Sequence, residues 1–553
     1  MPDTKIFRAL AEAFVAEGVD TLFVLTGDGN MHWEAAIAEA PGFQSYHVRH
    51  EHAACAMASA YAVKTGKVGV ASVTCGPGLT QIMTALATAA QARIPLVVFA
   101  GESPLNAAWY NQHIDQAPLV LGTGARYIEA HSASRVLDDV RNAFLIARRD
   151  RIPVVIGVPL DLQQQTLTNA KAYVPSQSLL PATGPMPPHP DDVARALERI
   201  KGSKRIIILG GRGAYQSDAA AACETLAGLC GALLSATLPV RGLFDHSPYS
   251  IGIAGGFAHE VAREYFEKAD LIIGVGASLT HHTVDGGKLF PNASILQIDV
   301  EPVGIRQGRK AADDYVRGDA TLTVQALIDG LQGAKRQADS AWRSPDLAAR
   351  MDGPPDSTAF ATLGAGADPR DVVRAIDNAI PKDWEIVNAS GHCSYFSAQM
   401  RGRSAERFLT IREFGAIGNG LSYAIGVAAT KPDRPVVLID GDGGFLMHAQ
   451  ELETIRRHKL KILICILNDG AYGSEVHKLR ADGINDHGAI FGRGDLGQVA
   501  RGFGLRGEVV TDLSTLPALL AAHEKSSQSE VWDFPISDRV TSPVMRALVA
   551  KRK

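Results

Sequence analysis

Short apolar runs rich in β-branched residues alternate with longer stretches of helical spacing along most of this chain. In the first third, the runs DTLFVLTG, KVGVASVTCG, IPLVVFAGE and RIPVVIGVP each end in or near a glycine or proline turn. Continuous apolar runs separated by helical patterns are typical of parallel strands that are buried on both faces of a sheet. The pattern therefore predicts an α/β protein with doubly wound parallel sheets.

The same alternation occurs in three blocks, which predicts three domains of similar size. The second block contains the strand-like runs RIIILGG, DLIIGVG and ASILQIDV, and the third contains WEIVNAS, RPVVLIDGDG, KILICILND and SEVWDFPI. Polar, proline-rich stretches separate the blocks and read as linkers. We expect an N-terminal domain at residues 1–165, a central domain at 190–333 and a C-terminal domain at 368–545.

Composition narrows the class of protein. The chain has 553 residues, 46% of them hydrophobic, and a net charge of -4, so a large core is expected and nothing suggests a nucleic-acid partner. The six cysteines are scattered without a CxxC motif, which is typical of buried thiols in a reducing compartment. No apolar run approaches the length of a membrane span, and the N-terminus has the spacing of an amphipathic helix. We expect a cytoplasmic protein without a membrane partner.

An acidic glycine turn follows one strand, and a second acid follows the next. The run VVLID leads into Gly441-Asp442-Gly443-Gly444, and KILICILN leads into Asp469, 27 positions after Asp442. Ligands in such sheets bind beyond the carboxyl ends of the strands. Either turn alone would be an ordinary turn, but two acids at matching strand ends favour a divalent cation such as Mg²⁺, which takes one or two carboxylates together with phosphate oxygens.

Four segments in this order resemble the signature of the thiamine diphosphate-dependent enzymes. They are the His-Glu context RHEHAACAMASAYA, the TCGPG segment, the stretch REFGAIGNG, and GDG followed by 24 residues and Asn468-Asp469. The resemblance covers essentially the whole chain and implies pyrimidine-binding, middle and diphosphate-binding domains. It also implies Mg²⁺ held by Asp442, Asp469 and the carbonyl of Ala471. Asp469 stands where the family usually has a second asparagine.

The resemblance also implies which residues bind the coenzyme. Glu51 would share a proton with the aminopyrimidine ring, although a glutamate that opens a helix is more often a solvated acid. Ile417 would support the bent form of the coenzyme. The remaining implied contacts are Thr74, Ser390, His392, Gly415, Gly441, Asp442, Gly443, Gly444, Asp469 and Tyr472. In this family Glu51 and the diphosphate site of one active centre come from different subunits, so a homodimer or homotetramer is implied.

The reaction depends on residues near the reactive carbon of the coenzyme. By resemblance the candidates are Asp28, His113, Glu475, His281 and His282, although each also has a structural interpretation as a turn or surface residue. Acids at two family positions favour non-oxidative decarboxylation of a 2-oxo acid through an enamine intermediate. The alternative is an acetolactate synthase-like or benzaldehyde lyase-like carboligase or acyloin lyase, and a non-catalytic paralogue is a third possibility. The glycines of ILGGRGAYQ lack a full GxGxxG, so FAD is possible but not expected.

Overall fold

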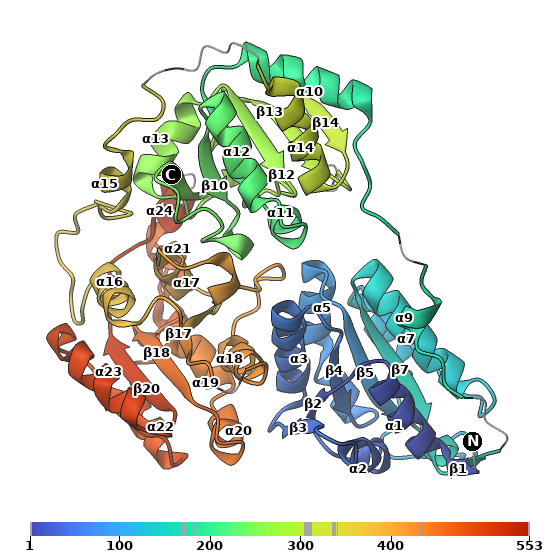
Figure 1. Ribbon diagram of the computed structural model, residues 1–553. Helices are drawn as coiled ribbons and strands as arrows, with labels where there is room; N and C mark the ends of the chain where they lie inside the picture. The colour runs from blue at the N-terminus through green and yellow to red at the C-terminus, as the bar shows by residue number, and fades with distance from the viewer. Residues whose placement is uncertain are drawn as a thin grey trace.

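Three parallel β-sheets, each flanked by helices on both faces, make up the structure. It is a computed structural model that describes residues 3–168, 172–181, 183–302, 312–333, 339, 341–431 and 433–550. Each sheet has six strands, and the predicted fold class is confirmed. The three domains surround a common junction, with the N-terminal domain in blue, the central domain in green and the C-terminal domain in orange and red (Figure 1).

The N-terminal sheet has the strand order β3-β2-β4-β5-β7-β6. The strands are β2 (Thr21–Val24), β3 (Gln44–His47), β4 (Gly69–Val73), β5 (Leu96–Glu102), β6 (Arg126–Glu129) and β7 (Pro153–Pro159), with a separate ribbon of β1 (Thr4–Lys5) and β8 (Thr166–Leu167). The helices are α1 (Ile6–Ala16), α2 (Met31–Ala38), α3 (Glu51–Thr65), α4 (Pro77–Thr80), α5 (Met83–Ala92), α6 (Ala117–Gly122), α7 (Val136–Asp150) and α8 (Leu160–Gln163).

The central sheet has the order β11-β10-β9-β12-β13-β14. Its strands are β9 (Ile206–Gly210), β10 (Leu233–Ala236), β11 (Ser250–Ile253), β12 (Leu271–Val275), β13 (Ser294–Asp299) and β14 (Asp314–Arg317). The helices are α10 (Pro190–Gly202), α11 (Arg212–Gln216), α12 (Ala220–Cys230), α13 (Glu260–Lys268) and α14 (Ala320–Leu331), with short 3₁₀ turns at Leu238–Val240 and Asp285–Gly287.

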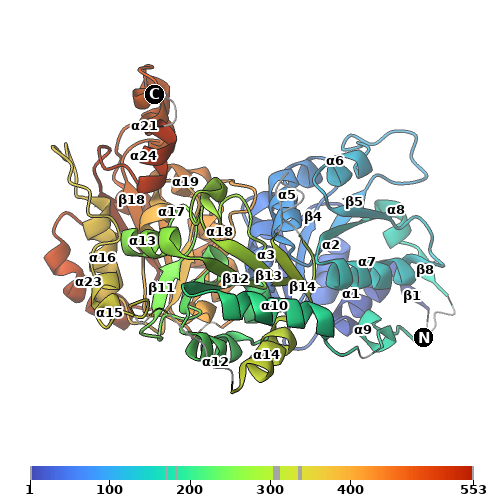
Figure 2. The same cartoon turned by 90° about the horizontal axis from the view of Figure 1, so that it is seen from above.

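The C-terminal sheet has the order β16-β15-β17-β18-β20-β19. Its strands are β15 (Glu385–Asn388), β16 (Phe408–Leu409), β17 (Val436–Gly441), β18 (Ile462–Asn468), β19 (Arg506–Val509) and β20 (Glu530–Pro535). The helices are α16 (Pro369–Ala379), α17 (Cys393–Ser397), α18 (Gly420–Ala428), α19 (Asp442–Met447), α20 (Glu451–Arg457), α21 (Gly473–Ala481), α22 (Leu496–Gly502), α23 (Leu516–Lys525) and α24 (Pro543–Ala550). Figure 2 shows α24 and α21 together at one edge of the molecule.

The two predicted linkers carry little regular structure among their described residues. Helix α9 (Ser176–Leu179) lies in the first and helix α15 (Leu347–Met351) in the second. Residues 169–171 and 182 of the first, and 334–338 and 340 of the second, lie outside the described residues. Among the described helices, none has both the length and the apolar character to cross a membrane.

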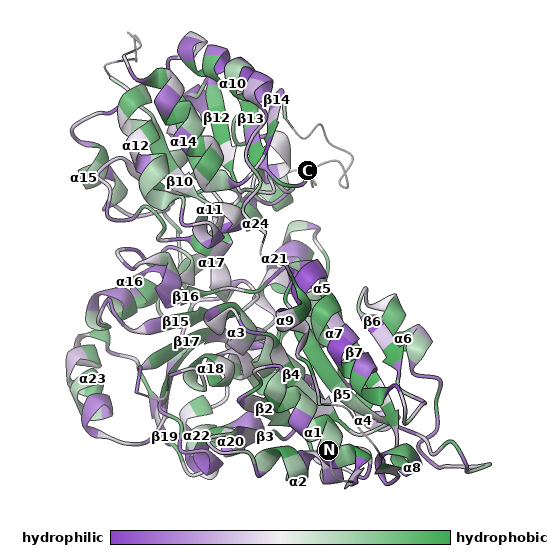
Figure 3. Ribbon diagram, turned by 45° about the vertical axis from the view of Figure 1, so that its right-hand side comes forward, coloured by the Kyte–Doolittle hydropathy of each residue, from purple (hydrophilic) through white to green (hydrophobic). Residues whose placement is uncertain are grey.

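Helix α3 packs directly against helix α18, and this contact joins the N-terminal and C-terminal domains. The residues of α3 from His52 to Ala62 are all buried, and most of them are small, so the two backbones approach closely. A Cβ atom on Gly426 would lie 2.3 Å from the carbonyl oxygen of Met57. One hydrophobic cluster includes residues of both domains, so they share a core there. Figure 3 shows apolar colouring on the strands beside this contact.

Arg212 joins all three domains. It is the first residue of α11 in the central domain, and its guanidinium donates to the carbonyl oxygen of Ala92 at 2.9 Å. The same group forms an ion pair with Glu413 of the C-terminal domain at 3.1 Å. This arrangement fixes the central domain beside the loop that precedes α18.

We predict that Gly426→Ala destabilises the protein by about 1 to 3 kcal/mol, because the added methyl would press on the Met57 carbonyl. Thermal unfolding would show this as a lower Tm. Gly228→Ala is the matched control, because Gly228 lies in α12 with open space around it and alanine favours a helix there. Equal Tm values for Gly426→Ala and the native protein would contradict the tight contact.

Candidate active site

The two predicted acidic residues lie at the carboxyl ends of neighbouring strands. Strands β17 and β18 pair in parallel with Gly441 opposite Leu467, so the turns that follow them are adjacent. The backbone N–H of Gly470 donates to Asp442 Oδ2 at 2.7 Å, which ties the two turns together. Asp442 is buried, and Asp469 accepts a hydrogen bond from the N–H of Ala471 at 3.2 Å. The structure thus brings the two predicted acidic ligands together, with Ala471 in the same turn as Asp469.

The electrostatics of this pair fit a bound cation. Burial raises the pKa of Asp442, and burial together with the charge of Asp442 raises the pKa of Asp469. Two buried carboxylates this close are unfavourable when both are ionised. A hard divalent cation between them would offset their repulsion, and carboxylate and carbonyl oxygens are the ligands that Mg²⁺ prefers. The donor set at this turn therefore fits Mg²⁺.

A third acid, which the sequence analysis missed, lies beneath the same turn. Asp440 is fully buried, and burial raises its pKa to about 8. Its Oδ1 accepts a hydrogen bond from the N–H of Gly441 at 2.8 Å. Cβ atoms at Gly420 and Gly444 would lie 2.1 and 2.7 Å from its carboxylate oxygens. These two glycines make room for Asp440, which explains one function of the glycine-rich turn.

The remaining candidates on this sheet lie around the acid pair. A Cβ atom on Gly443 would lie 2.9 Å from the ring of Tyr472, so this glycine lets the ring lie against the turn. Ser390 and His392 follow β15, the strand next to β17. Gly473, beside Tyr472, leaves space for the Asp469 carboxylate, because a Cβ there would lie 2.4 Å from Asp469 Oδ2.

His392 forms part of a histidine pair that the sequence analysis missed. Its ring lies 4.8 Å from that of His477, between centroids, and burial together with His477 lowers the pKa of His392 to about 3. Burial lowers the pKa of His477 to about 4. The N–H of Ser542 donates to His392 Nε2 at 3.1 Å, so neutral His392 carries its proton on Nδ1. His392 is thus an uncharged hydrogen-bond donor at neutral pH.

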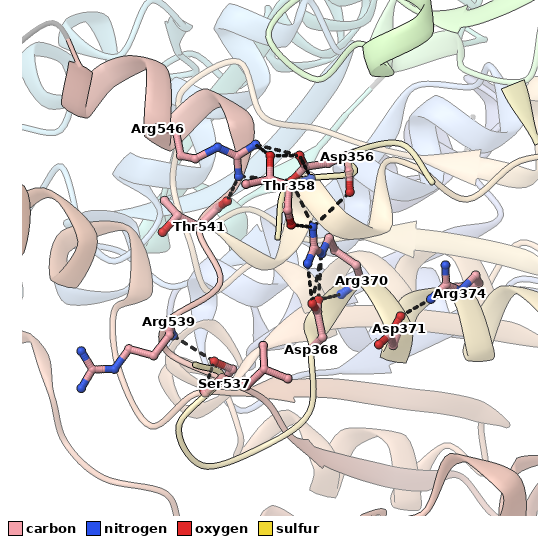
Figure 4. A network of polar contacts seen from close by, with 11 residues as sticks. Asp356, Thr358, Asp368, Arg370, Asp371, Arg374, Ser537, Arg539, Thr541 and Arg546 are labelled. Carbon is pink, nitrogen blue, oxygen red and sulfur yellow. Dashed lines mark hydrogen bonds and ion pairs between the residues drawn. The ribbon is translucent and has the colours of Figure 1, made fainter. Parts of the chain in front are cut away.

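The C-terminal segment that supplies Ser542 is anchored by a network of charged groups (Figure 4). Arg546 of α24 forms an ion pair with Asp356 at 2.7 Å and donates to the hydroxyl of Thr358 at 3.0 Å. Arg370 binds Asp368 at 2.6 Å and lies 3.6 Å from Asp356. The second linker and the chain end therefore stabilise each other beside His392.

A second group of candidates lies at the carboxyl edge of the N-terminal sheet. The hydroxyl of Thr74 accepts a hydrogen bond from the N–H of Gly29 at 3.0 Å, which places the turn that carries Asp28 against the turn after β4. Asp28 itself is exposed. Glu51 opens α3, and a Cβ on Gly78 would lie 3.6 Å from its Oε1, so its carboxylate points toward the TCGPG turn. Asp28, Glu51 and Thr74 therefore converge on one edge.

The loop after β5 completes this edge. His113 Nδ1 lies 3.0 Å from the Ser103 hydroxyl, and its side chain is exposed. The Cys75 thiol donates to Gln112 Oε1 at 3.3 Å, and burial raises the pKa of that thiol. Cys75 is therefore a protonated packing residue. Gln112 has no distinguishing motif, and the sequence analysis missed it.

The loop before α18 carries Gly415 and Ile417. Gly415 adopts a left-handed φ of 73°, and its N–H donates to the carbonyl of Arg412 at 3.0 Å. Ile417 is half-buried. Glu413 of this loop pairs with Arg212 of the central domain at 3.1 Å.

The last three candidates are two histidines of the central domain and Glu475, whose N–H donates to the carbonyl of Tyr472 at 2.9 Å. His281 and His282 follow β12, and their rings lie 5.9 Å apart. Burial, His281 and the charge of Arg412 lower the pKa of His282, so the histidine pair faces the loop before α18. Glu475 lies in the first turn of α21, where it pairs with Lys478 at 3.1 Å, and is more than half exposed.

Comparison with known proteins identifies the family. Models of the thiamine pyrophosphate enzyme family match residues 4–119 (N-terminal TPP binding domain), 193–327 (central domain) and 389–530 (C-terminal TPP binding domain). The chain belongs to the thiamine pyrophosphate enzyme family. It is a thiamine diphosphate-dependent enzyme of the decarboxylase or carboligase type.

The relatives of this chain include several acetolactate synthases. The chain is 30% identical to the acetolactate synthase large subunit of Parasynechococcus marenigrum, over 96% of this chain and 87% of the relative. It is 28% identical to a probable acetolactate synthase large subunit of Methanococcus aeolicus, over 84% and 80%. It is also 28% identical to chloroplastic acetolactate synthase 3 of Brassica napus, over 84% and 72%. These relatives favour the carboligase alternative over simple decarboxylation.

We predict that Mg²⁺ with thiamine diphosphate raises the Tm more at about pH 8 than at about pH 6. The folded protein has raised pKa values at Asp442 and Asp469, so it binds more protons than the unfolded chain. Metal-free stability therefore falls as pH rises above about 4, while deprotonation favours metal binding. Thermal scans at both pH values, with and without Mg²⁺, measure the difference.

The Asp469→Asn variant is the control for this experiment. It removes one of the two like charges, so its stabilisation by Mg²⁺ and coenzyme should depend less on pH. Equal stabilisation of the native protein at both pH values would contradict a metal site at the acid pair.

Proposed function

We propose that this protein is a Mg²⁺- and thiamine diphosphate-dependent carboligase that joins the unit left by decarboxylation of a 2-oxo acid to a second carbonyl compound. The match to acetolactate synthases over nearly the whole chain is the observation that carries this proposal. The acid pair, with Asp442 buried and Asp469 half-buried, and the position of Glu51 at the opening of α3 support it, because a non-catalytic paralogue has no need of either.

The residues around the acid pair would hold the metal and the diphosphate. Asp442, Asp469 and the carbonyl of Ala471 would bind Mg²⁺, as their fit at the turn supports. His392 would donate from Nδ1, and the hydroxyl of Ser390 and the glycine backbone after β17 would lie alongside. Thiamine diphosphate supplies a carbon nucleophile whose ring accepts the electron pair freed when carbon dioxide leaves.

The residues at the carboxyl edge of the N-terminal sheet would bind and transfer protons. Glu51 would share a proton with a ring nitrogen of the aminopyrimidine, and its carboxylate points toward the TCGPG turn. Thr74, Gly415 and Ile417 would orient the pyrimidine ring. Asp28, exposed beside Thr74, would hold or deliver a proton at the substrate oxygen.

A second copy of the chain would complete each active centre. The N-terminal edge exposes the apolar side chains Leu105, Trp109 and Ile114, and the C-terminal edge exposes Phe414, Leu446 and Met447. Exposed apolar groups beside two half-sites are typical of an interface. A homodimer, or a tetramer built from dimers, would cover them and bring Glu51 of one subunit to the acid pair of another.

Release of the aldehyde without carboligation is the second candidate reaction. The position of Asp28, exposed beside Thr74, favours it, because a carboxyl group there could relay a proton from solvent to the reactive carbon.

We predict that Glu51→Gln lowers kcat at least ~10²-fold, because an amide cannot exchange a proton with the pyrimidine nitrogen. Coenzyme binding and Tm should change little. Glu198→Gln, on the exposed face of α10, is the matched control and should retain full activity. Near-native turnover by Glu51→Gln would show that Glu51 does not exchange a proton with the coenzyme during catalysis.

The reaction itself is tested by incubating the protein, Mg²⁺ and thiamine diphosphate with a panel of 2-oxo acids, with and without aldehyde acceptors. We expect mass spectrometry to detect carbon dioxide and a new hydroxyketone or hydroxy-oxo acid. Carbon dioxide with free aldehyde alone would instead establish the decarboxylase. The absorbance spectrum of the same sample tests for a bound flavin.

A further inference from the structure

Three histidines gather where the N-terminal and C-terminal domains meet, and the proposed chemistry uses none of them. His50 and His52 lie at the start of α3, and His448 follows α19. The ring of His448 lies 5.0 Å from that of His52, nearly parallel at 16°, and 5.2 Å from that of His50. His52 and His448 are each only 7% exposed. We refer to His50, His52 and His448 as the histidine cluster.

The cluster links three segments that carry candidate site residues. His50 is the N-cap of α3, and its Nδ1 accepts a hydrogen bond from the N–H of His52, so the two histidines enclose Glu51. His52 Nε2 donates to Asn419 Oδ1 at 2.5 Å, and Asn419 caps α18 just after Ile417.

The third segment begins at the metal turn. His448 ends the stretch that starts at Asp442, and its ring would lie 3.2 Å from a Cβ on Gly418. A shift of either buried ring would therefore move the start of α3, which carries Glu51, relative to two segments of the C-terminal domain. These are the loop with Gly415 and Ile417 and the turn with Asp442.

The acidic groups around the cluster accept hydrogen bonds from neighbouring donors, the backbone N–H of His50 among them, and burial raises the pKa of Glu451 to about 7. Its titration is common to the native chain and to variants of His52 and His448, so it cancels when their pH dependences are compared. Glu451 of α20 accepts the N–H of Arg49 at 3.0 Å and the hydroxyl of Thr454 at 2.7 Å. Glu453 pairs with Arg49 at 2.5 Å and with Arg457 at 3.3 Å.

The other neighbours of the cluster are Glu51, which lies between His50 and His52 in the sequence, and the polar residues Tyr423, Asn419 and Gln450. Tyr423 of α18 interacts with the side chain of Asn419, and burial together with the charge of Glu413 raises the pKa of Tyr423. Gln450 Nε2 lies 3.4 Å from His448 Nδ1. Across the described part of the chain, no ion pair with a carboxylate reaches the rings of His52 or His448.

We propose that His52 and His448 are positioning residues that hold the Glu51 turn against the C-terminal domain only while both rings are uncharged, so that acid opens this junction. The proposal rests on the proposed function for the role of Glu51, but the junction itself exists without it. An imidazolium in either ring would be buried beside a second imidazole without a carboxylate partner.

The direction of the pH dependence follows from the burial of the two rings. Burial lowers the pKa of His52, and burial with the two neighbouring rings lowers that of His448 to about 4. The folded state therefore binds fewer protons than the unfolded chain. Stability from this source is complete above about pH 6.5 and is lost as pH falls toward 4.

The test measures Tm of the coenzyme-free protein at about pH 7.5 and about pH 5.5 for the native chain, His448→Asn and His52→Gln. Asparagine and glutamine keep hydrogen-bonding groups at both positions but do not titrate. We expect each variant to lose less Tm on acidification than the native chain, by about 1 to 2 °C. His32→Asn is the matched control, because His32 is exposed on α2.

Parallel Tm curves for the native chain and both variants would overturn the proposal, and so would equal flattening in His32→Asn. The pH profile of kcat/KM gives the second readout, in which the acid limb of His448→Asn should lie at lower pH than that of the native enzyme. If the proposed reaction is wrong, activity is absent while the Tm comparison still decides the role of the cluster.

Discussion

The close packing of α3 on α18 determines where the functional groups of this protein lie. At Gly426 the two helices leave no room for a single methyl group beside the Met57 carbonyl. Such a contact has one geometry, because protein interiors do not deform continuously. It fixes Glu51, at the start of α3, relative to the loop with Gly415 and Ile417. The shared hydrophobic core makes these two domains one unit, and Arg212 attaches the central domain to it.

The turns after β17 and β18, which carry the candidate metal ligands, hold several acidic groups close together. The ends of the parallel strands β17 and β18 bring three acids close together, namely Asp440, Asp442 and Asp469. Burial raises the pKa of each. A fold without a ligand would gain nothing from three such acids, because buried carboxylates without cations are costly. Glycines at positions 420 and 444 are needed to make the arrangement possible. The turn is therefore built at a cost to stability that cation binding would offset.

Much of the fold was predictable because buried parallel strands have a distinct pattern. Every strand named from the sequence is present, from β2 and β4 to β18 and β20. The missed strands β3, β6, β11, β14, β16 and β19 are sheet edges, where shorter and partly exposed segments such as Gln44–His47 lose the continuous apolar signal. The inner strand β10 was also missed, because LLSA is too short to stand out.

The candidate site was predictable where a motif marks a strand end, as for Asp442 and Asp469. Asp440, Arg412 and His477 could not be found this way, because their contacts arise only when distant segments pack together. The same holds for His52 and His448, which are separated by nearly 400 positions and stack only in the folded chain. The choice between carboligation and decarboxylation came from relatives, since both reactions need the same acid pair and the same glutamate.

Calorimetric titration of the metal-free protein with thiamine diphosphate, in the presence of Mg²⁺ or of EDTA, tests whether Asp442 and Asp469 form the metal site. We expect binding near one coenzyme per chain with Mg²⁺, little binding in EDTA, and loss of the Mg²⁺ effect in Asp442→Ala. Binding of equal affinity in EDTA, or an unchanged Mg²⁺ effect in Asp442→Ala, would contradict the assignment of the buried acid pair as the metal site.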